Sequence, residues 1–432
     1  MDTSKAEISL FGCRDTRTFL IVIFAVGFVL RMTASLYVDQ VLGGAYGFRD
    51  FAENLINGDG YFWRYTNNKE VLIQNLITFR PPLYTFFYTG MLFLFGDHSF
   101  LFIMVQSIIG ATLPVLIFLI GRYVWDSKTA SIAAVIACVY PHFLTRAGNV
   151  SDDNLFMPFL CLGILFLLRS LKTSTFYDTF FSALFIGLSL MTRQTIILFI
   201  PLIVLYLLFQ NRRRHFIHTS FFAAISFFML LPWLIFHYSK YDNLSLSDAT
   251  GRTIWTGNNQ FTYDPSIFPD LSVDKIERRM FSLIPKADVE ELKHKNTVEQ
   301  DRYFMENAIK FIREHPLDFA KSLYYKNLGL FGFTYNPKTE YTADKNSQLR
   351  QWIHTLSYVP LLLLGLIGLG VNIGKRNHSF IFILLIISFV LISWLFWSHT
   401  RHAIPYHMVW ILFSADVISR ISLRVFPTNR FQ

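Results

Sequence analysis

Long apolar stretches alternate with short polar segments along most of the chain. Each stretch is about 17 to 22 residues long, and about 20 apolar residues are enough for an α-helix to cross the hydrocarbon core of a bilayer. About ten of them occur, near residues 18–38, 100–121, 129–145, 154–171, 175–192, 194–210, 216–237, 352–373, 379–397 and 402–420. The pattern therefore predicts an all-α protein with about ten transmembrane helices.

Composition supports this class. Hydrophobic residues make up 53% of the 432 residues and charged ones only 16%, whereas soluble domains carry about 25% charged residues. Three cysteines (Cys13, Cys138 and Cys161) are too few for a disulfide framework, and two of them lie inside apolar stretches. The composition excludes a disordered chain, a coiled coil and a small secreted domain.

The net charge of +9 is a topology signal rather than evidence of a nucleic-acid partner. Lys and Arg recur at the ends of apolar stretches, as expected when cytoplasmic loops carry the positive charge. If the N-terminus with Lys5, Arg14 and Arg17 is cytoplasmic, the later basic clusters also fall on that side. These clusters are Arg122 with Lys128, Arg169 with Lys172, Arg212–Arg214, Lys375 with Arg376, and Arg420 with Arg424. We expect a multi-pass protein of the inner (plasma) membrane.

Two large regions then lie outside the cytoplasm, at 40–96 and 238–350. The apolar segment 83–95 is only about 13 residues long, so we interpret it as a membrane-embedded half-helix within the first region. Residues 299–333 have helical periodicity that His315-Pro316 interrupts, which predicts two helices lying on the membrane. The chain divides into an N-terminal transmembrane module (1–237), a large external loop (238–350) and C-terminal transmembrane helices (351–432).

Ionisable residues gather in the external segments, where a membrane protein places them for a functional reason. The positive-inside rule does not explain Arg146, Arg193 or Arg401. A phosphate at the outer membrane surface would explain them, because the arginine guanidinium binds phosphate in a bidentate manner. The alternative is pairing with nearby acidic residues or with lipid headgroups. The whole external set is Asp50, Glu53, Arg80, Arg146, Asp152, Asp153, Arg193, Arg401 and His402.

Carboxylates beside cations suit the transfer of a sugar from a lipid phosphate. A hydroxyl acceptor needs a general base, and a carboxylate can take its proton. A departing phosphate needs no proton at neutral pH, but its growing negative charge needs arginine, lysine or a metal. Proton-coupled transporters also bury Asp and Arg, so this pattern alone leaves both classes open.

The chain resembles the GT-C glycosyltransferases that use polyprenyl-phosphate sugars, a group that includes protein O-mannosyltransferases and the lipid A aminoarabinose transferase. The resemblance runs from about residue 18 to 420 and rests on short motifs in the family's order. In chain order they are Ala52–Tyr61, Arg80–Tyr84 with Leu94–Gly96, Ser151–Phe156, Gly187–Arg193 with Pro201, Pro232-Trp233, Gly251–Asn258, His315-Pro316 with Lys326, and Arg401 with Pro405. The family's first-loop acid usually precedes Ala52 by about eight residues, where this chain has Gly44, so Asp50 is the nearest acid and Asp39 lies further upstream, at the end of the first predicted span.

The resemblance implies roles for individual residues. Asp50 and Asp153 are the expected catalytic carboxylates. The expected contacts to the donor phosphate are Arg193, Arg401, Arg80 and Lys326, and those to the sugar are Tyr84, Trp255, Asn258 and His402. Ordinary loop packing would equally explain Trp255. No cofactor is implied with certainty, since family members differ on metals, but Asp152 with Asp153 could bind a divalent cation.

The expected function is that of an inverting membrane glycosyltransferase acting at the extracytoplasmic membrane face. Its partners would be a polyprenyl-phosphate-sugar donor, a hydroxyl acceptor on a lipid, glycan or protein, and membrane lipids. The alternatives are a polyprenyl-lipid flippase or transporter, and a non-catalytic membrane scaffold. A transporter often has internal repeats and polar residues at mid-bilayer, and a scaffold does not explain the ordered Asp and Arg set.

Overall fold

The computed structural model describes residues 14–36, 47–66, 73–209, 213–262, 279–333, 347–373, 378–398 and 400–425, and these are almost entirely helical. The N-terminal helices are α1 (Arg14–Leu36), α2 (Phe48–Asn57), α3 (Pro82–Phe95), α4 (Ser99–Val124), α5 (Ser127–Val139), α6 (Pro141–Leu144), α7 (Asp153–Thr173), α8 (Phe176–Thr192), η1 (Gln194–Ile196), α9 (Phe199–Phe209) and α10 (Arg213–Tyr241). The later ones are α11 (Thr250–Gly257), α13 (Lys286–Lys293), α14 (Thr297–Glu314), α15 (Pro316–Phe331), α16 (Ser347–Asn372), α17 (Phe380–Leu395), α18 (Thr400–Ala403), η3 (Ile404–Tyr406) and α19 (His407–Val425).

Every predicted apolar stretch coincides with helical structure. Within the described ranges, five helical segments are long and apolar enough to cross a membrane: Asp15–Ser35, Ser99–Val124, Asp153–Thr173, Phe216–Tyr241 and Gln351–Asn372. Five more apolar segments are 10–17 residues long: Pro82–Phe95, Ser127–Val139, Phe176–Thr192, Gln194–Phe209 and Phe380–Leu395. The chain is therefore an all-α integral membrane protein, while the number of spans stays a prediction.

Proline determines where several of these helices begin. The predicted stretch 129–145 is divided into α5 and α6, because Pro141 has no N–H to donate to the turn before it. Pro82 and Pro316 each occupy the first turn of their helix, where the missing N–H costs nothing. The predicted half-helix 83–95 is thus α3, and the predicted pair around His315 is α14 and α15.

One hairpin departs from the all-α prediction. Strands β1 (Trp63–Thr66) and β2 (Ile73–Leu76) pair antiparallel, with Trp63 opposite Leu76. Aromatic and β-branched residues such as Trp63 and Ile73 favour the extended backbone. The hairpin lies in the first large external region, directly before α3.

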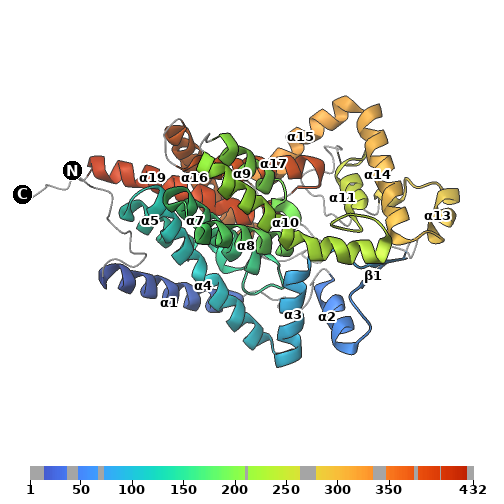
Figure 1. The fold of residues 1–432 in the computed structure, drawn as a ribbon, viewed down its shortest axis with the longest axis horizontal. Coiled ribbons are helices and arrows are strands. Elements are labelled where there is room, and N and C mark those ends of the chain that lie inside the picture. The colour runs from blue at the N-terminus through green and yellow to red at the C-terminus, as the bar shows by residue number, and fades with distance from the viewer. Residues whose placement is uncertain are drawn as a thin grey trace, which may run out of the picture.

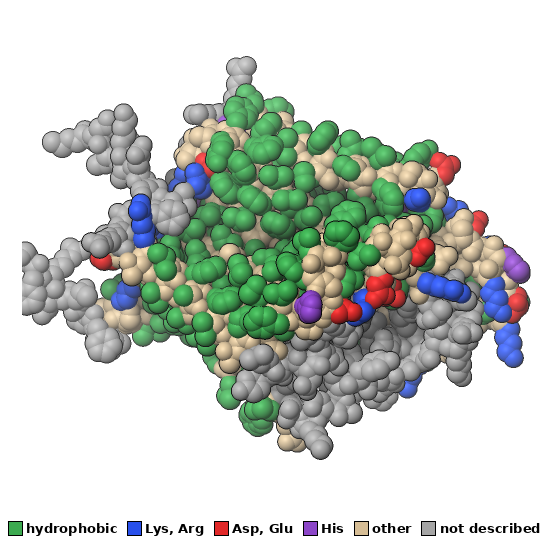
Figure 2. Space-filling view, turned by 90° about the horizontal axis from the view of Figure 1, so that it is seen from below, with side chains coloured by type: hydrophobic (Ala, Val, Ile, Leu, Met, Phe, Trp, Pro, Cys, Tyr) green, Lys and Arg blue, Asp and Glu red, His purple; other side chains and the backbone are tan. Residues whose placement is uncertain are grey.

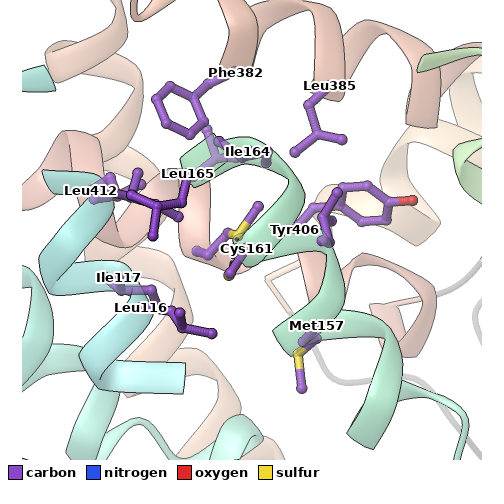
Figure 3. Packing of buried hydrophobic residues seen from close by; sticks show 14 of the residues in the cluster. Leu116, Ile117, Met157, Cys161, Ile164, Leu165, Phe382, Leu385, Tyr406 and Leu412 are labelled. Carbon is purple, nitrogen blue, oxygen red and sulfur yellow. Dashed lines mark hydrogen bonds between the residues drawn. The ribbon is translucent and has the colours of Figure 1, made fainter. Parts of the chain in front are cut away.

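The main core joins helices that are far apart in the sequence. Figure 3 shows Leu116 and Ile117 of α4 close to Cys161 and Ile164 of α7, with Leu412 of α19 nearby. Small residues allow α4 and α5 to approach closely: a Cβ added to Gly121 would lie 3.0 Å from the Cα of Ala130. Close backbone approach at small residues is typical of helix packing in membranes.

The two regions predicted to be external lie together at one end of the molecule. In Figure 1 the start of α1 and the end of α19 are at the left, whereas α11, α13, α14 and the hairpin are at the right. Figure 2 shows a broad apolar belt between two ends at which charged side chains gather. This distribution fits a belt in lipid with polar ends in water.

Candidate functional site

The most unusual polar group is a buried carboxylate that two arginines face. Asp153, at the start of α7, is 1% exposed. It forms an ion pair with the Nη1 of Arg193, which directly follows α8, and the Nη1 of Arg146 lies 3.6 Å from its other oxygen. The hydroxyl of Ser151 also donates to Asp153 over 3.2 Å. The structure thus brings together a predicted catalytic acid, a predicted phosphate ligand and Arg146.

This arrangement bears on what Asp153 can do chemically. Both of its oxygens face guanidinium groups, and the side chains of Arg146 and Arg193 are only 8% and 12% exposed. Two guanidinium groups thus engage both oxygens of this carboxylate, which leaves it badly placed to take a proton from an acceptor hydroxyl. Asp153 therefore orients the arginines. The Nε of Arg146 is buried and has no hydrogen-bond partner among the described residues.

The loop before α7 is held in place by buried amide side chains. The Nε2 of Gln106 on α4 donates to the carbonyls of Ala147 and Asn149 over 2.9 and 3.0 Å. Asn154 donates to the Oε1 of Gln106 (2.8 Å) and to the carbonyl of Arg146 (3.0 Å). These bonds satisfy buried backbone acceptors and fix the backbone that carries Arg146.

Tyr84, predicted to contact the sugar, belongs to the same support. Its ring is fully buried, its hydroxyl donates to Gln106 over 2.9 Å, and it accepts the backbone N–H of Ser151 over 2.9 Å. The ring of Phe48 on α2 contacts it edge to face at 4.9 Å. Tyr84 connects α2 to the loop that carries Asp153.

Asp50 lies on α2, apart from the Asp153 cluster. Its side chain reaches the surface and forms no ion pair with another described residue. Its neighbour Arg49 instead binds Glu53 (2.6 Å) and Asp97 (3.0 Å). Partial burial is the main cause that raises the pKa of Asp50, and the charge of Glu53 adds to it. Asp50 is therefore a carboxylate of the first external region that is still available to accept a proton.

Arg80 lies just before α3 and contacts α2. Its guanidinium lies 4.9 Å from the ring centroid of Phe48 and 4.9 Å from that of Phe79. Its carbonyl accepts the hydroxyl of Tyr61 over 3.2 Å. Cation–π contacts of this kind help to position a guanidinium group.

Lys326 lies in a second buried polar group, formed by the later loops. Its Nζ donates to the Oδ1 of Asn258 (2.9 Å) and to the carbonyl of Trp394 (2.7 Å). Burial lowers the pKa of Lys326 to about 7. The Nδ2 of Asn258 donates to the carbonyls of Ile254 and Leu395, so this amide connects α11 to the end of α17. Both residues face inward, where their described partners are protein groups.

The remaining predicted residues are placed as follows. Trp255 is 4% exposed and stacks on Phe304 at 5.7 Å, which matches the loop-packing alternative. Arg401 and His402 belong to α18, and the side chain of Arg401 lies outside the described residues. α18 packs against α15, the helix of Lys326.

A divalent cation does not fit the acidic pair in this arrangement. Asp152 is half-buried beside Asp153, whose oxygens the two arginines already face. Within the described ranges, no three His, Cys, Asp or Glu side chains converge to hold a metal ion.

Three histidines form a buried cluster that the sequence does not reveal. His142 of α6, His354 of α16 and His407 of α19 come from three separate stretches, and the Nδ1 of His354 lies 2.9 Å from the Nε2 of His142. The Nδ1 of His407 shares a 2.7 Å hydrogen bond with the hydroxyl of Tyr140. His142 is four residues before Arg146, so the cluster borders the Asp153 site.

Comparisons with known proteins agree with this fold. A model of the family described as dolichyl-phosphate-mannose-protein mannosyltransferase matches residues 79–236. No curated protein matches the chain. The apo crystal structure of the oligosaccharyltransferase of Archaeoglobus fulgidus is similar, with a TM-score of 0.57 and 15% identity over 95% of this chain. The structure of that enzyme tethered to an acceptor peptide has a TM-score of 0.56 and 13% identity over 98% of this chain.

The chain spans about half the length of these relatives, since it covers 51% of each oligosaccharyltransferase chain. ArnT from Cupriavidus metallidurans bound to undecaprenyl phosphate aligns over 95% of this chain and 79% of its own, with 13% identity and a TM-score of 0.40. The resemblance found in the sequence is confirmed by the family model and by the fold: the chain has the fold of the GT-C membrane glycosyltransferases.

Proposed function

We propose that this chain is an inverting glycosyltransferase that moves a sugar from a polyprenyl-phosphate donor to a hydroxyl acceptor at the extracytoplasmic membrane face. The observation that carries the proposal is the buried group of Arg146, Asp153 and Arg193, in which two cations face one carboxylate. A buried cation in excess is costly unless an anion approaches it. A structure of the oligosaccharyltransferase AglB from A. fulgidus is a complex with an inhibitory peptide and a dolichol-phosphate, which is an anion of this class.

In this proposal the phosphate of the donor binds Arg193 and Arg146. The acceptor oxygen attacks the anomeric carbon, and the bond from that carbon to the phosphate oxygen breaks on the opposite face of the sugar. The phosphate leaves with its electron pair, and the guanidinium groups stabilise the negative charge that grows on it. Arg80 and Arg401 are further candidates for this role.

The proton of the acceptor hydroxyl passes to Asp50. Asp153 is unsuited to this step because both of its oxygens face arginines. Asp50 forms no such pair with another residue that the structure describes, and its raised pKa brings it closer to the range in which a carboxylate acts as a base. Asp50→Asn should therefore abolish transfer while donor binding persists, and full activity in that variant would refute this assignment.

The proposal is tested by measuring the binding of undecaprenyl phosphate to purified protein in lipid nanodiscs. We expect Arg193→Ala and Arg146→Ala each to weaken binding by about 1.5–3 kcal/mol, the value of a hydrogen bond to a charged group. Arg420→Ala is the matched control, since Arg420 also pairs with an aspartate (Asp416, 2.9 Å) but lies near the C-terminal end of α19. Binding that is indifferent to Arg146 and Arg193 would contradict the proposal.

A further inference from the structure

A second buried carboxylate joins the two external loops. Asp248, between α10 and α11, is 1% exposed. Its Oδ2 accepts the backbone N–H groups of Ile77 (2.6 Å) and Thr78 (3.0 Å) and the hydroxyl of Tyr241 (2.8 Å). Ile77 and Thr78 directly follow β2, so a residue of the second loop binds the backbone of the first across about 170 positions in the sequence.

His237 binds the same short segment through its side chain. It is fully buried, and its Nδ1 lies 2.7 Å from the Oγ1 of Thr78. The ring of Tyr241 packs against the His237 ring at 5.0 Å. Residue 78 is therefore held at its backbone by Asp248 and at its hydroxyl by His237. Two independent contacts to one residue determine both its position and its orientation.

Arg80 follows Thr78 by two residues, which corresponds to about 7 Å of extended chain. Between them, Phe79 contacts the guanidinium of Arg80 at 4.9 Å and that of Arg252 at 5.3 Å. Arg252 lies in the first turn of α11. The backbone N–H groups of Gly251 and Arg252 both donate to Asp301 over 2.8 Å. The segment that ends at Arg80 is thus positioned from the second loop.

We propose that Asp248, with His237, is a positioning residue that sets the place of Arg80 for the donor phosphate. This inference rests on the proposed function, in which Arg80 is a candidate phosphate ligand. Asp248 itself touches no substrate in this scheme. It acts by holding the backbone of residues 77 and 78, so that Arg80 meets the phosphate in one geometry. A shift of about 1 Å in such a group is enough to weaken a transfer reaction strongly.

The first test is a double-mutant cycle on the binding of undecaprenyl phosphate in nanodiscs, with Asp248→Ala, Arg80→Gln and the double variant. We expect Asp248→Ala and Arg80→Gln each to weaken binding about tenfold, the scale of one hydrogen bond to a charged group. The double variant should bind no more weakly than Arg80→Gln, because Asp248 acts through Arg80. Additive losses, or unchanged binding in Asp248→Ala, would overturn the inference.

The conservative variant Asp248→Asn separates positioning from charge and guards against misfolding. Its amide oxygen can still accept the two backbone N–H groups, so binding should stay within about twofold of wild type. A loss as large as in Asp248→Ala would refute positioning by these hydrogen bonds. Asp178→Asn is the stability control: it breaks a buried ion pair with Arg169 (2.9 Å) and should lower thermal stability without changing phosphate binding.

Hydrogen exchange tests the positioning of residues 77–80 by Asp248 separately from the proposed function. Asp248→Ala should raise the amide exchange of residues 77–80, whereas Asp178→Asn should leave it unchanged. Unchanged exchange in Asp248→Ala would overturn the positioning role whatever the binding result. If wild type itself fails to bind undecaprenyl phosphate, the proposed function fails, and raised exchange in Asp248→Ala would still establish the connection between the loops.

Discussion

Removing the charge of Asp153 tests the central feature of the site. In Asp153→Asn the side chain keeps its size and can still accept the hydroxyl of Ser151, but Arg146 and Arg193 lose their shared counter-ion. Both guanidinium groups stay about nine-tenths buried. Breaking a buried ion pair by removing one partner costs roughly 3–5 kcal/mol, because it leaves an uncompensated charge. Asp152, half-buried alongside, offsets part of this, so we expect about 3 kcal/mol.

The assay is equilibrium unfolding of the purified protein in detergent, with Asp97→Asn as the matched control. Asp97 also pairs with an arginine, at 3.0 Å from Arg49, but its side chain is 57% exposed. An exposed pair contributes about 0–1 kcal/mol. The two identical substitutions should therefore differ by at least about 2 kcal/mol. Equal effects would refute the reasoning that burial makes the Asp153 pair costly to break.

A second substitution identifies the cause as stranded charge. Arg146→Met in the Asp153→Asn background removes one of the two unpaired cations and keeps an apolar side chain of similar length. The double variant should be more stable than Asp153→Asn alone, since apolar replacement of buried ions is often neutral or stabilising. If the double variant lost as much unfolding free energy as Asp153→Asn and Arg146→Met lose together, packing rather than unpaired charge would be the main cause of the instability.

Three further predictions concern the external loops. Burial lowers the pKa of Lys326 from its usual 10.5 to about 7, so between these pH values the unfolded chain binds more protons and the free energy of unfolding rises with pH. In Lys326→Met, denaturation curves measured from about pH 7 to 9 should lose up to about 1.4 kcal/mol of that rise per pH unit. The same pH dependence in Lys326→Met and wild type would contradict this prediction. Asp301 accepts the first N–H groups of α11, and burial raises the pKa of its carboxyl group. Asp301→Asn keeps an acceptor for these N–H groups and should cost less than about 1 kcal/mol in unfolding free energy, whereas Asp301→Ala should cost about 2 kcal/mol. Equal costs in the two variants would contradict a capping role of Asp301. Gly251→Ala should destabilise the protein by about 1–3 kcal/mol, because the new Cβ would lie 2.1 Å from the carbonyl oxygen of Asp301. Gly90→Ala is the control: its new Cβ would have no described atom within 4 Å, so the melting temperature should be unchanged or raised.

The helices were predictable from the sequence because their signals are local. Apolar length identifies the spanning helices, and proline identifies where α3 and α15 begin. The start of α14 also has a local signal: Asn296 and Glu299 form a reciprocal capping box. The hairpin of β1 and β2 has only four residues in each strand, which is too short for a period-2 pattern to stand out.

The site was predictable only in part, because its contacts join distant segments. The sequence identified Asp153 and Arg193 as functional candidates, yet 40 positions separate them, and nothing local shows that Arg193 turns towards α7. The inward direction of Lys326 and the burial of Tyr84 depend on how α15 and α3 pack. Nothing in the sequence near Asp248 distinguishes it from other acidic loop residues, because the N–H groups that it binds belong to Ile77 and Thr78 in the other loop. The sequence therefore indicated which residues are candidates, but it did not predict where their side chains point.

The charges of the site suggest how it would distinguish the donor from the spent carrier. Arg146, Arg193 and Asp153 sum to one net positive charge, which the neighbouring Asp152 partly offsets, and the sugar-phosphate diester of the donor carries one negative charge. The spent carrier is a phosphate monoester whose second pKa is about 6, so above that pH it carries nearly two negative charges. Under the proposed function, Arg80 would balance the second charge.

The binding of undecaprenyl phosphate, relative to a diester analogue, should therefore strengthen as the pH rises from about 5 to 8. The comparison with the diester cancels the titration of the protein's own groups. Arg80→Gln should remove this difference while Arg420→Ala keeps it, because Arg420 lies near the C-terminal end of α19 and pairs there with Asp416. A monoester and a diester that respond equally to pH would show that the site does not sense the second charge, and Arg80 would then have no part in binding the leaving phosphate.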